Sequence, residues 1–164
     1  VYMLDLSAID LERIEASAIH PKRITQSKSD DGSPTFFPDG KRIVFVSSRD
    51  GLHRIYAMNL DGTDEKPLSP TRYDCYSPVV SPDGKTIAFV SARDGDIEIY
   101  MMDADGSHER RITNGIGVSM QPAFSPDGTK LAFVSDRSNT FQLYLMDLTH
   151  LVTQKELIQR LNAE

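Results

Sequence analysis

The stretch Val80-Ser81-Pro82-Asp83-Gly84-Lys85 decides the fold of this chain, because it occurs three times at a fixed spacing. The other copies are Phe36-Phe37-Pro38-Asp39-Gly40-Lys41 and Phe124-Ser125-Pro126-Asp127-Gly128-Thr129, so the prolines recur every 44 residues. Each copy precedes a similar apolar run: Ile43–Ser47, Ile87–Ser91 and Leu131–Ser135. A constant period of this length indicates a repeat protein.

Each repeat contains four candidate strands separated by turns. In the first complete repeat they span residues 34–37, 42–47, 54–60 and 66–69, and Pro67 favours a sheet edge for the fourth. Pro38-Asp39-Gly40 predicts a tight turn, because Pro fixes φ, Asp bonds the backbone ahead and Gly accepts positive φ. Short strands with turns about every eight to twelve residues are typical of all-β proteins.

The absence of helical patterns between these strands excludes parallel βαβ units and favours antiparallel sheets. A four-stranded antiparallel unit repeated at this period predicts the blade of a β-propeller. The second strand of each repeat is apolar almost throughout, which indicates that both of its faces are buried. We therefore expect the blades to pack through these residues: Phe45, Phe89 and Phe133, with Ile43, Ile87 and Leu131.

Residues 1–148 supply two strands of a first blade, two complete sets of four, and three strands of a last blade, about three and a half blades in all. Val1–Leu6 and Leu143–Leu148 are copies of the same third strand, so they cannot share one position in a closed ring. The chain is then a fragment of a larger propeller, an open arc, or a protomer of a homo-oligomer that completes the ring. We favour a fragment or a protomer, and because the chain begins at Val1 inside a strand, we expect it to be a piece of a longer protein.

Two helices are expected outside the repeats. Ser7 begins a pattern of apolar residues at helical spacing that stops before Pro21. Residues 149–164 lack turn residues, and their leucines and Ile158 can share one stripe, which predicts a C-terminal helical tail.

Composition excludes some classes of partner. The net charge of −6 and the pI of about 5.2 argue against nucleic acid, whose phosphates need a basic surface. No apolar stretch approaches the roughly 20 residues of a membrane span, so we expect no membrane insertion. Cys75 is the only cysteine, which excludes an intramolecular disulfide.

The second repeat, Pro78 to Thr113, resembles the TolB-like β-propeller repeat. The resemblance lies in Ser81-Pro82-Asp83-Gly84, in Ile99-Tyr100 with Met102-Asp103, and in Arg111-Ile112-Thr113. Weaker copies span residues 34–68 and 122–148. The family includes a periplasmic component of the Tol-Pal system and the non-catalytic propellers of tricorn and prolyl-oligopeptidase-type peptidases. The resemblance therefore implies a non-enzymatic propeller, periplasmic or extracytoplasmic, or an accessory propeller of a hydrolase whose catalytic domain lies outside this chain.

The residues themselves offer little catalytic chemistry. The four histidines have no zinc spacing, the Asp-Gly turns lack the ligand pattern of a calcium loop, and no nucleophile elbow or phosphate loop occurs. We therefore expect no enzyme activity, no metal and no cofactor. The recurring Ser-x-Arg of Ser47/Arg49, Ser91/Arg93 and Ser135/Arg137 is repeated in every blade, which favours a structural role for the arginine.

The connections between blades are the best candidates for binding, because they vary while the scaffold repeats. They span residues 26–33, 70–77 and 114–121 and should open on one face of the propeller. The second combines aromatic and charged side chains, as protein-binding surfaces do. The predicted surface for a protein or peptide partner comprises Arg72, Tyr73, Asp74, Tyr76, Met120 and Gln121. An alternative is that Tyr73 and Tyr76 only pack between blades.

Overall fold

The computed structural model describes residues 1–3, 20–70, 72–115 and 117–149. In these residues it contains thirteen strands, the number that the repeat pattern predicts. In chain order they are β1 (Tyr2–Met3), β2 (Lys22–Arg23), β3 (Asp31–Phe36), β4 (Arg42–Ser47), β5 (Arg54–Asn59), β6 (Lys66–Pro67), β7 (Cys75–Val80), β8 (Thr86–Ser91), β9 (Glu98–Asp103), β10 (Arg110–Arg111), β11 (Ser119–Phe124), β12 (Lys130–Ser135) and β13 (Gln142–Asp147).

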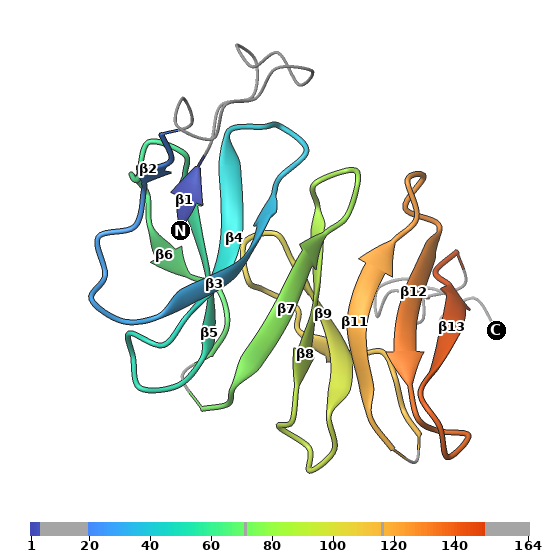
Figure 1. The fold of residues 1–164 in the computed structure, drawn as a ribbon. Helices are drawn as coiled ribbons and strands as arrows, with labels where there is room; N and C mark the ends of the chain where they lie inside the picture. Colours follow the sequence, from blue (N-terminus) through green and yellow to red (C-terminus); the bar gives the residue numbers. More distant parts are fainter. Residues whose placement is uncertain (4–19, 71, 116, 150–164) are drawn as a thin grey trace, which may run out of the picture.

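The strands form four antiparallel sheets that follow one another along the chain (Figure 1). β1 and β2 pair alone and form the half-blade. Blade I has the order β3-β4-β5-β6, blade II the order β7-β8-β9-β10, and blade III the order β11-β12-β13. This arrangement confirms the all-β propeller fold, and β6 with its Pro67 lies at a sheet edge as predicted.

The predicted helices, from Ser7 toward Pro21 and over the C-terminal tail, fall on residues 4–19 and 150–164, outside the described residues. They stay predictions.

The Pro-Asp-Gly turn is built as the sequence predicts. In blade II the Asp83 carboxylate accepts hydrogen bonds from the Ser81 hydroxyl at 2.6 Å and from the Lys85 backbone N–H at 3.1 Å. Gly84 has a φ of 71°, a conformation that glycine adopts without steric cost. The recurring phrase is therefore a structural hairpin turn.

Each blade packs through two chemically different faces. The aromatic face carries a Phe on the second strand beside a Tyr on the third, such as Phe89 and Tyr100 with ring centroids 5.9 Å apart. It lies against the preceding blade, where Phe89 and Tyr100 share one buried cluster with Val44 and Ile55 of blade I. The opposite, aliphatic face of blades I and II lies against the following blade.

The same interface recurs at the next two junctions. Phe133 and Tyr144 of blade III pack against Val90 and Ile99 of blade II. Phe45 and Tyr56 of blade I belong to a third cluster, against which Val1 and Met3 of the half-blade pack. The buried members of this cluster are Ile24, Ile43, Phe45, Tyr56 and Met58. The predicted use of the three phenylalanines and their isoleucine or leucine neighbours in blade packing is thus confirmed. Each large apolar side chain buried in this way contributes roughly 1.5–3 kcal/mol, so the interfaces between blades hold the array together.

Gly106 shows how closely successive blades fit. Its φ is +92°, and a Cβ atom built at this position would lie 2.6 Å from the main-chain oxygen of Leu68 in blade I. Only glycine satisfies both the backbone conformation and this approach.

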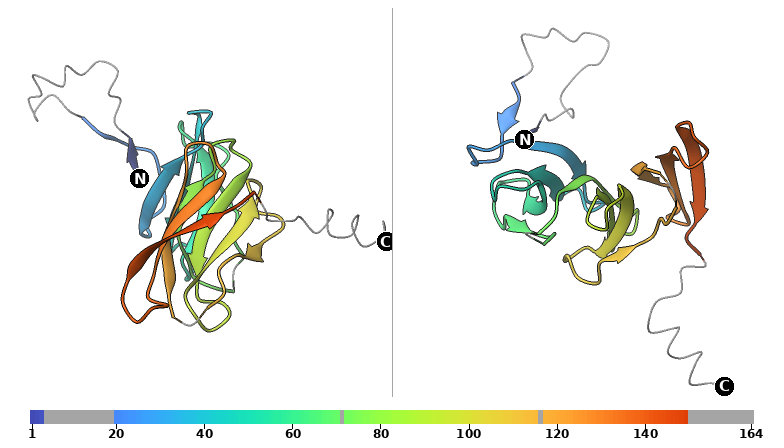
Figure 2. Two further views of the ribbon diagram at one scale, coloured as in Figure 1. Left: turned by 90° about the vertical axis from the view of Figure 1, so that its right-hand side faces the viewer. Right: turned by 90° about the horizontal axis from the view of Figure 1, so that it is seen from below.

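The four sheets form an open arc, seen most clearly in the right-hand view of Figure 2. The half-blade and blade III occupy the two ends of the arc, and no strand of one pairs with a strand of the other. Among the described residues the chain therefore does not close a ring by itself.

Candidate functional site

Two kinds of loop gather at the same end of the blades. The connections between blades and the loops between second and third strands (residues 48–53, 92–97 and 136–141) lie at the lower end of the sheets in Figure 1. The Pro-Asp-Gly hairpins lie at the opposite end. We call these ends the loop face and the hairpin face. The sequence predicts a binding surface on the loop face.

A cluster of His53, Asp74 and Tyr76 lies on the loop face where blades I and II meet. The Asp74 carboxylate accepts hydrogen bonds from the His53 backbone N–H at 2.8 Å and lies 3.1 Å from His53 Nδ1. The Tyr76 hydroxyl is 3.2 Å from the same Nδ1, and the two rings lie 4.9 Å apart between centroids. These contacts fix the Tyr76 ring while leaving 39% of the residue exposed.

The surroundings of Asp74 and Tyr76 shift the pKa values of both side chains. The hydrogen bond from the His53 backbone N–H, aided by the His53 side chain, lowers the pKa of the Asp74 carboxyl. Partial burial and the neighbouring negative charge of Asp74 raise the pKa of the Tyr76 hydroxyl. The cluster therefore offers a carboxylate and a neutral phenol, an acceptor and a donor, at neutral pH.

Tyr73 extends this surface on the other side of Asp74. Its residue is 40% exposed, and the Arg93 guanidinium carbon lies 5.5 Å from its ring centroid. Arg93 Nη2 also contacts the buried Cys75 Sγ at 3.5 Å, and its Nη1 pairs with Glu109. The exposed Tyr73 ring thus contacts the Arg93 guanidinium, whose position is fixed by Cys75 and Glu109. An anchored aromatic ring loses little entropy on binding, which is what a recognition residue needs.

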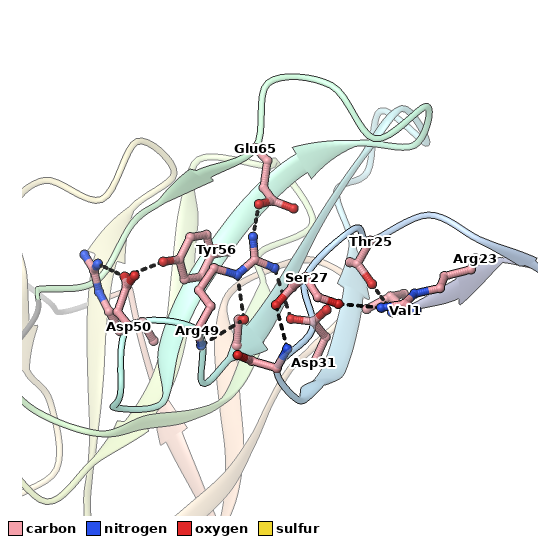
Figure 3. A network of polar contacts seen from close by, with 12 residues as sticks. Val1, Arg23, Thr25, Ser27, Asp31, Arg49, Asp50, Tyr56 and Glu65 are labelled. Atoms are coloured by element: carbon pink, nitrogen blue, oxygen red, sulfur yellow. Dashed lines mark hydrogen bonds and ion pairs between the residues drawn. The ribbon is translucent and has the colours of Figure 1, made fainter.

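The arginine equivalent to Arg93 in blade I, Arg49, makes contacts of the same kind. Figure 3 shows that Arg49 Nη2 donates a hydrogen bond to Asp31 Oδ1 at 3.0 Å and that Arg49 also pairs with Glu65. Its guanidinium carbon lies 4.5 Å from the Tyr56 ring centroid, and the Tyr56 hydroxyl donates to Asp50. In blades I and II the arginine of the Ser-x-Arg pattern therefore ties the first strand to the residue just before the fourth, across the Phe-Tyr pair. In blade III, Arg137 bonds Ser119 of the first strand. These contacts give the arginine the structural role that its repetition predicts.

The innermost strands β3, β7 and β11 share a β-bulge that the sequence did not reveal. The sequence places the first strand of blade I at residues 34–37, whereas β3 begins at Asp31 because the register shifts between Gly32 and Thr35. The same shift occurs in β7 and β11. The bulged residues have positive φ without being glycine: Ser33 at 49°, Ser77 at 49° and Gln121 at 53°. Such backbone strain costs about 1–3 kcal/mol per residue, which the surrounding structure must offset.

The three bulges line one shallow groove of about 260 Å³, formed by residues 33–35, 77–79 and 121–122. Thr35 Oγ1 donates to the Pro78 carbonyl at 3.2 Å and ties the first two of these strands together. Tyr76 immediately precedes the β7 bulge, so the exposed ring and the groove belong to the same inner strand.

The six predicted binding residues do not all have the same surroundings. Arg72, Tyr73 and Tyr76 are exposed, and Asp74 is partly buried beside them. Gln121 is exposed and lines the groove. Met120 instead packs against the core between blades II and III, where it contributes to stability. Its part in binding stays a prediction, as does that of the other five.

Sequence reasoning missed His53. It lies 21 residues before Asp74, in a different blade, and only the turn of the arc brings the two together. No local motif marks it, although the Asp50-Gly51 turn predicts that it lies at a blade end.

The described residues hold no group of three or more His, Cys, Asp or Glu side chains placed to bind a metal ion. Within the same ranges there is no helix long and apolar enough to cross a membrane.

Comparisons with known proteins agree with the architecture. Residues 63–158 match the family described as the TolB beta propeller domain. Over 43 residues, 26% of this chain, the sequence is 49% identical to the Tol-Pal system protein TolB of Bordetella pertussis, of which this segment is 10%. The structure of a putative TolB from Agrobacterium tumefaciens matches with a TM-score of 0.70 and 31% identity, over 78% of this chain and 49% of that one.

The fold is also found in an enzyme. A puromycin-hydrolyzing peptidase of Mycobacterium tuberculosis matches with a TM-score of 0.64 and 18% identity, over 80% of this chain and 21% of that one. Identity this low shows the fold alone. In each comparison the chain spans less than half of the relative's length.

Proposed function

The chain belongs to the TolB beta propeller family, and from this premise we propose that it is a non-enzymatic scaffold that binds a protein or peptide through its loop face. The proposed contact surface centres on Tyr73, Asp74 and Tyr76 and extends along the inner strands to Gln121. Arg72 lies at its edge. By the same resemblance we place the protein in the periplasm or another extracytoplasmic compartment.

One observation carries this proposal: two partly exposed tyrosines flank a carboxylate, and each ring is held in position by a neighbouring side chain, Arg93 or His53. Tyrosine is enriched at the energetic centres of protein interfaces, because it combines a large apolar surface with one polar atom. Arg93 beneath Tyr73 and His53 beside Tyr76 fix the two rings before a partner arrives. The adjoining groove exposes the backbone of bulged inner strands, whose polar groups suit an extended peptide.

The proposal is tested with a displayed library of random peptides selected on the immobilised chain, followed by calorimetry of an enriched peptide. We expect Tyr73→Ala and Tyr76→Ala each to weaken binding by at least about tenfold, the effect of removing an interface hot spot. Phe36→Ala is the matched control, because Phe36 is an exposed aromatic residue (57%) at the hairpin end of β3. Failure to enrich any peptide, or equal affinity of all three variants, would contradict the proposal.

A second candidate is an accessory propeller that admits substrates to a hydrolase domain. It is supported by the fold shared with the puromycin-hydrolyzing peptidase. A hydrolase domain encoded in the same reading frame would favour this role. A peptide that binds the loop face tightly, with no such domain present, would favour the scaffold.

A further inference from the structure

The connection from blade II to blade III begins with Asn114-Gly115, the only Asn-Gly pair in the chain. Both residues are exposed and belong to no strand. Within the described ranges, no group forms a hydrogen bond with the Asn114 side-chain amide or with the Gly115 backbone N–H. Neither group therefore has to give up a bond to these residues before it reacts.

The main chain is anchored immediately before this pair. Thr113 is buried, and its hydroxyl accepts a hydrogen bond from the Ile99 backbone N–H at 2.8 Å and donates one to Glu98. The core thus holds Thr113 and leaves the next two residues outside. Asparagine is thermolabile because the backbone nitrogen of the following residue can attack its side-chain carbonyl carbon. A following glycine favours this attack, since it has no Cβ to shield the nitrogen or restrict the backbone.

A fixed positive charge lies beside Gly115. A Cβ atom built on Gly115 would lie 3.9 Å from Arg137 Cζ and 4.0 Å from its Nη2. The Arg137 guanidinium is held by hydrogen bonds to Ser135 Oγ at 3.1 Å and to Ser119 Oγ at 3.2 Å. A cation at this distance stabilises the anion that forms when the Gly115 nitrogen loses its proton.

We propose that Asn114 is a site of spontaneous deamidation, with the Gly115 backbone nitrogen as nucleophile and Arg137 as the promoting cation. Hydroxide removes the Gly115 N–H proton, and the nitrogen attacks Asn114 Cγ. A new C–N bond closes a succinimide ring, while the bond from Cγ to the side-chain nitrogen breaks and ammonia leaves with a proton from water. A second water molecule then opens the ring at either carbonyl and leaves aspartate or isoaspartate at position 114.

The modification changes the loop face in a defined way. Either product adds one negative charge to a chain whose net charge is −6. Isoaspartate also adds one methylene group to the main chain at the start of the connection that leads to Gln121. The inference is independent of the proposed partner, because the reaction uses none of the residues of the proposed contact surface.

The experiment incubates the full 164-residue chain at mildly alkaline pH and follows each asparagine by mass spectrometry of its peptides. We expect Asn114 to convert at least about tenfold faster than Asn59 and Asn139, because bulkier residues, Leu60 and Thr140, follow these two. Asn59 also donates a hydrogen bond to a threonine hydroxyl at 2.9 Å. Isoaspartyl methyltransferase labels the isoaspartate product. An Asn114 that stays intact, or that converts no faster than the other two, overturns the proposal.

Gly115→Ala tests the nucleophile. The φ of Gly115 lies outside the left-handed region, and the added Cβ would meet Arg137 at an ordinary contact distance, so the variant should fold. We expect it to slow the conversion by at least about tenfold, because the methyl group obstructs the attack. Circular dichroism verifies the fold. Conversion of this variant at the wild-type rate would exclude the Gly115 nitrogen as the attacking group.

Arg137→Gln tests the cation. We expect the folded variant to convert at least about threefold more slowly than the folded wild type, because the charge beside the forming anion is gone. In concentrated urea the two chains should convert at the same rate, since only the fold brings Arg137 next to Gly115. Equal rates in the folded state would remove Arg137 from the mechanism, and a difference that persists in urea would show that the fold does not create its effect.

Discussion

Replacing Arg93 with methionine tests how the blades are held together. Arg93 lies over the Tyr100 ring at 4.5 Å and pairs with Glu109; the two side chains are 11% and 19% exposed. Burial alone would lower the pKa of Arg93, but the hydrogen bond and charge of Glu109 outweigh it and raise that pKa. Met retains the apolar stem, so the substitution removes the charge and its bonds but little packing.

The expected cost follows from what the substitution leaves behind. Glu109 Oε1 is already buried without a hydrogen-bond partner, and Arg93→Met would remove the ion-pair partner of Oε2 as well. Removing one member of a buried pair costs about 3–5 kcal/mol, and we take about 3 kcal/mol because this pair is not fully buried. Arg137 in blade III is the matched control: it stacks on Tyr144 at 4.8 Å, but no carboxylate of the described residues pairs with it. For Arg137→Met we expect about 1 kcal/mol.

Urea unfolding followed by circular dichroism measures both costs as shifts of the midpoint at constant slope. With a slope of about 2 kcal/mol/M, Arg93→Met should lower the midpoint by about 1.5 M and Arg137→Met by about 0.5 M. The double variant Arg93→Met/Glu109→Leu should recover most of the loss, because an apolar pair replaces the ionic one. Equal costs for the two arginines, or a double variant as unstable as the sum of its singles, would refute the reasoning.

Three further predictions concern the backbone, a turn and the thiol. Gly106→Ala should lower the midpoint of thermal unfolding by several degrees more than Gly95→Ala, because both positions have positive φ but only Gly106 meets a neighbouring blade. Hydrogen bonds from the Ser125 hydroxyl and from the Thr129 backbone N–H lower the pKa of Asp127 to about 2, which NMR titration of the carboxyl carbon should reproduce. This pKa lies below the ordinary value, so the contribution of Asp127 to stability is present above about pH 4 and is lost as the pH falls through about 2; a titration midpoint near 4 would show that the turn bonds are absent. Burial raises the pKa of the Cys75 thiol, so an aromatic disulfide reagent should react with it only after denaturation, and rapid reaction of the native chain would contradict its position in the core.

The repeat allowed much of the fold to be predicted from sequence. The second strand of blade I was predicted at residues 42–47, and β4 spans Arg42–Ser47. The turn residues mark both ends of such strands, and a short apolar run bounded by turns is typical of a strand with both faces buried. The first strands were predicted too short, because Pro34 reads as a strand boundary. The bulge beside it removes the proline from the hydrogen-bond ladder and lets pairing continue to Asp31.

The exposure of blade III could not be predicted from its residues. Leu143 and Leu145 follow the same pattern as Ile99 and Met101, and their sequence indicates burial equally well. What separates them is only whether another sheet follows in space. The grouping of residues in the candidate site could be predicted only in part for a similar reason. Tyr73, Asp74 and Tyr76 are near neighbours in the chain, whereas the contact with His53 depends on the tertiary structure, and binding at any of these residues stays a prediction.

The central claim, that this propeller binds its partner through the loop face, is tested most directly by NMR. The measurement is a titration of the isotope-labelled chain with an enriched peptide, following the backbone amide signals. The account predicts that shifts concentrate at His53, Tyr73–Tyr76 and Gln121 while the amides of Gly40, Gly84 and Gly128 on the hairpin face stay in place. Shifts centred on those three glycines, with the loop-face signals unmoved, would contradict it.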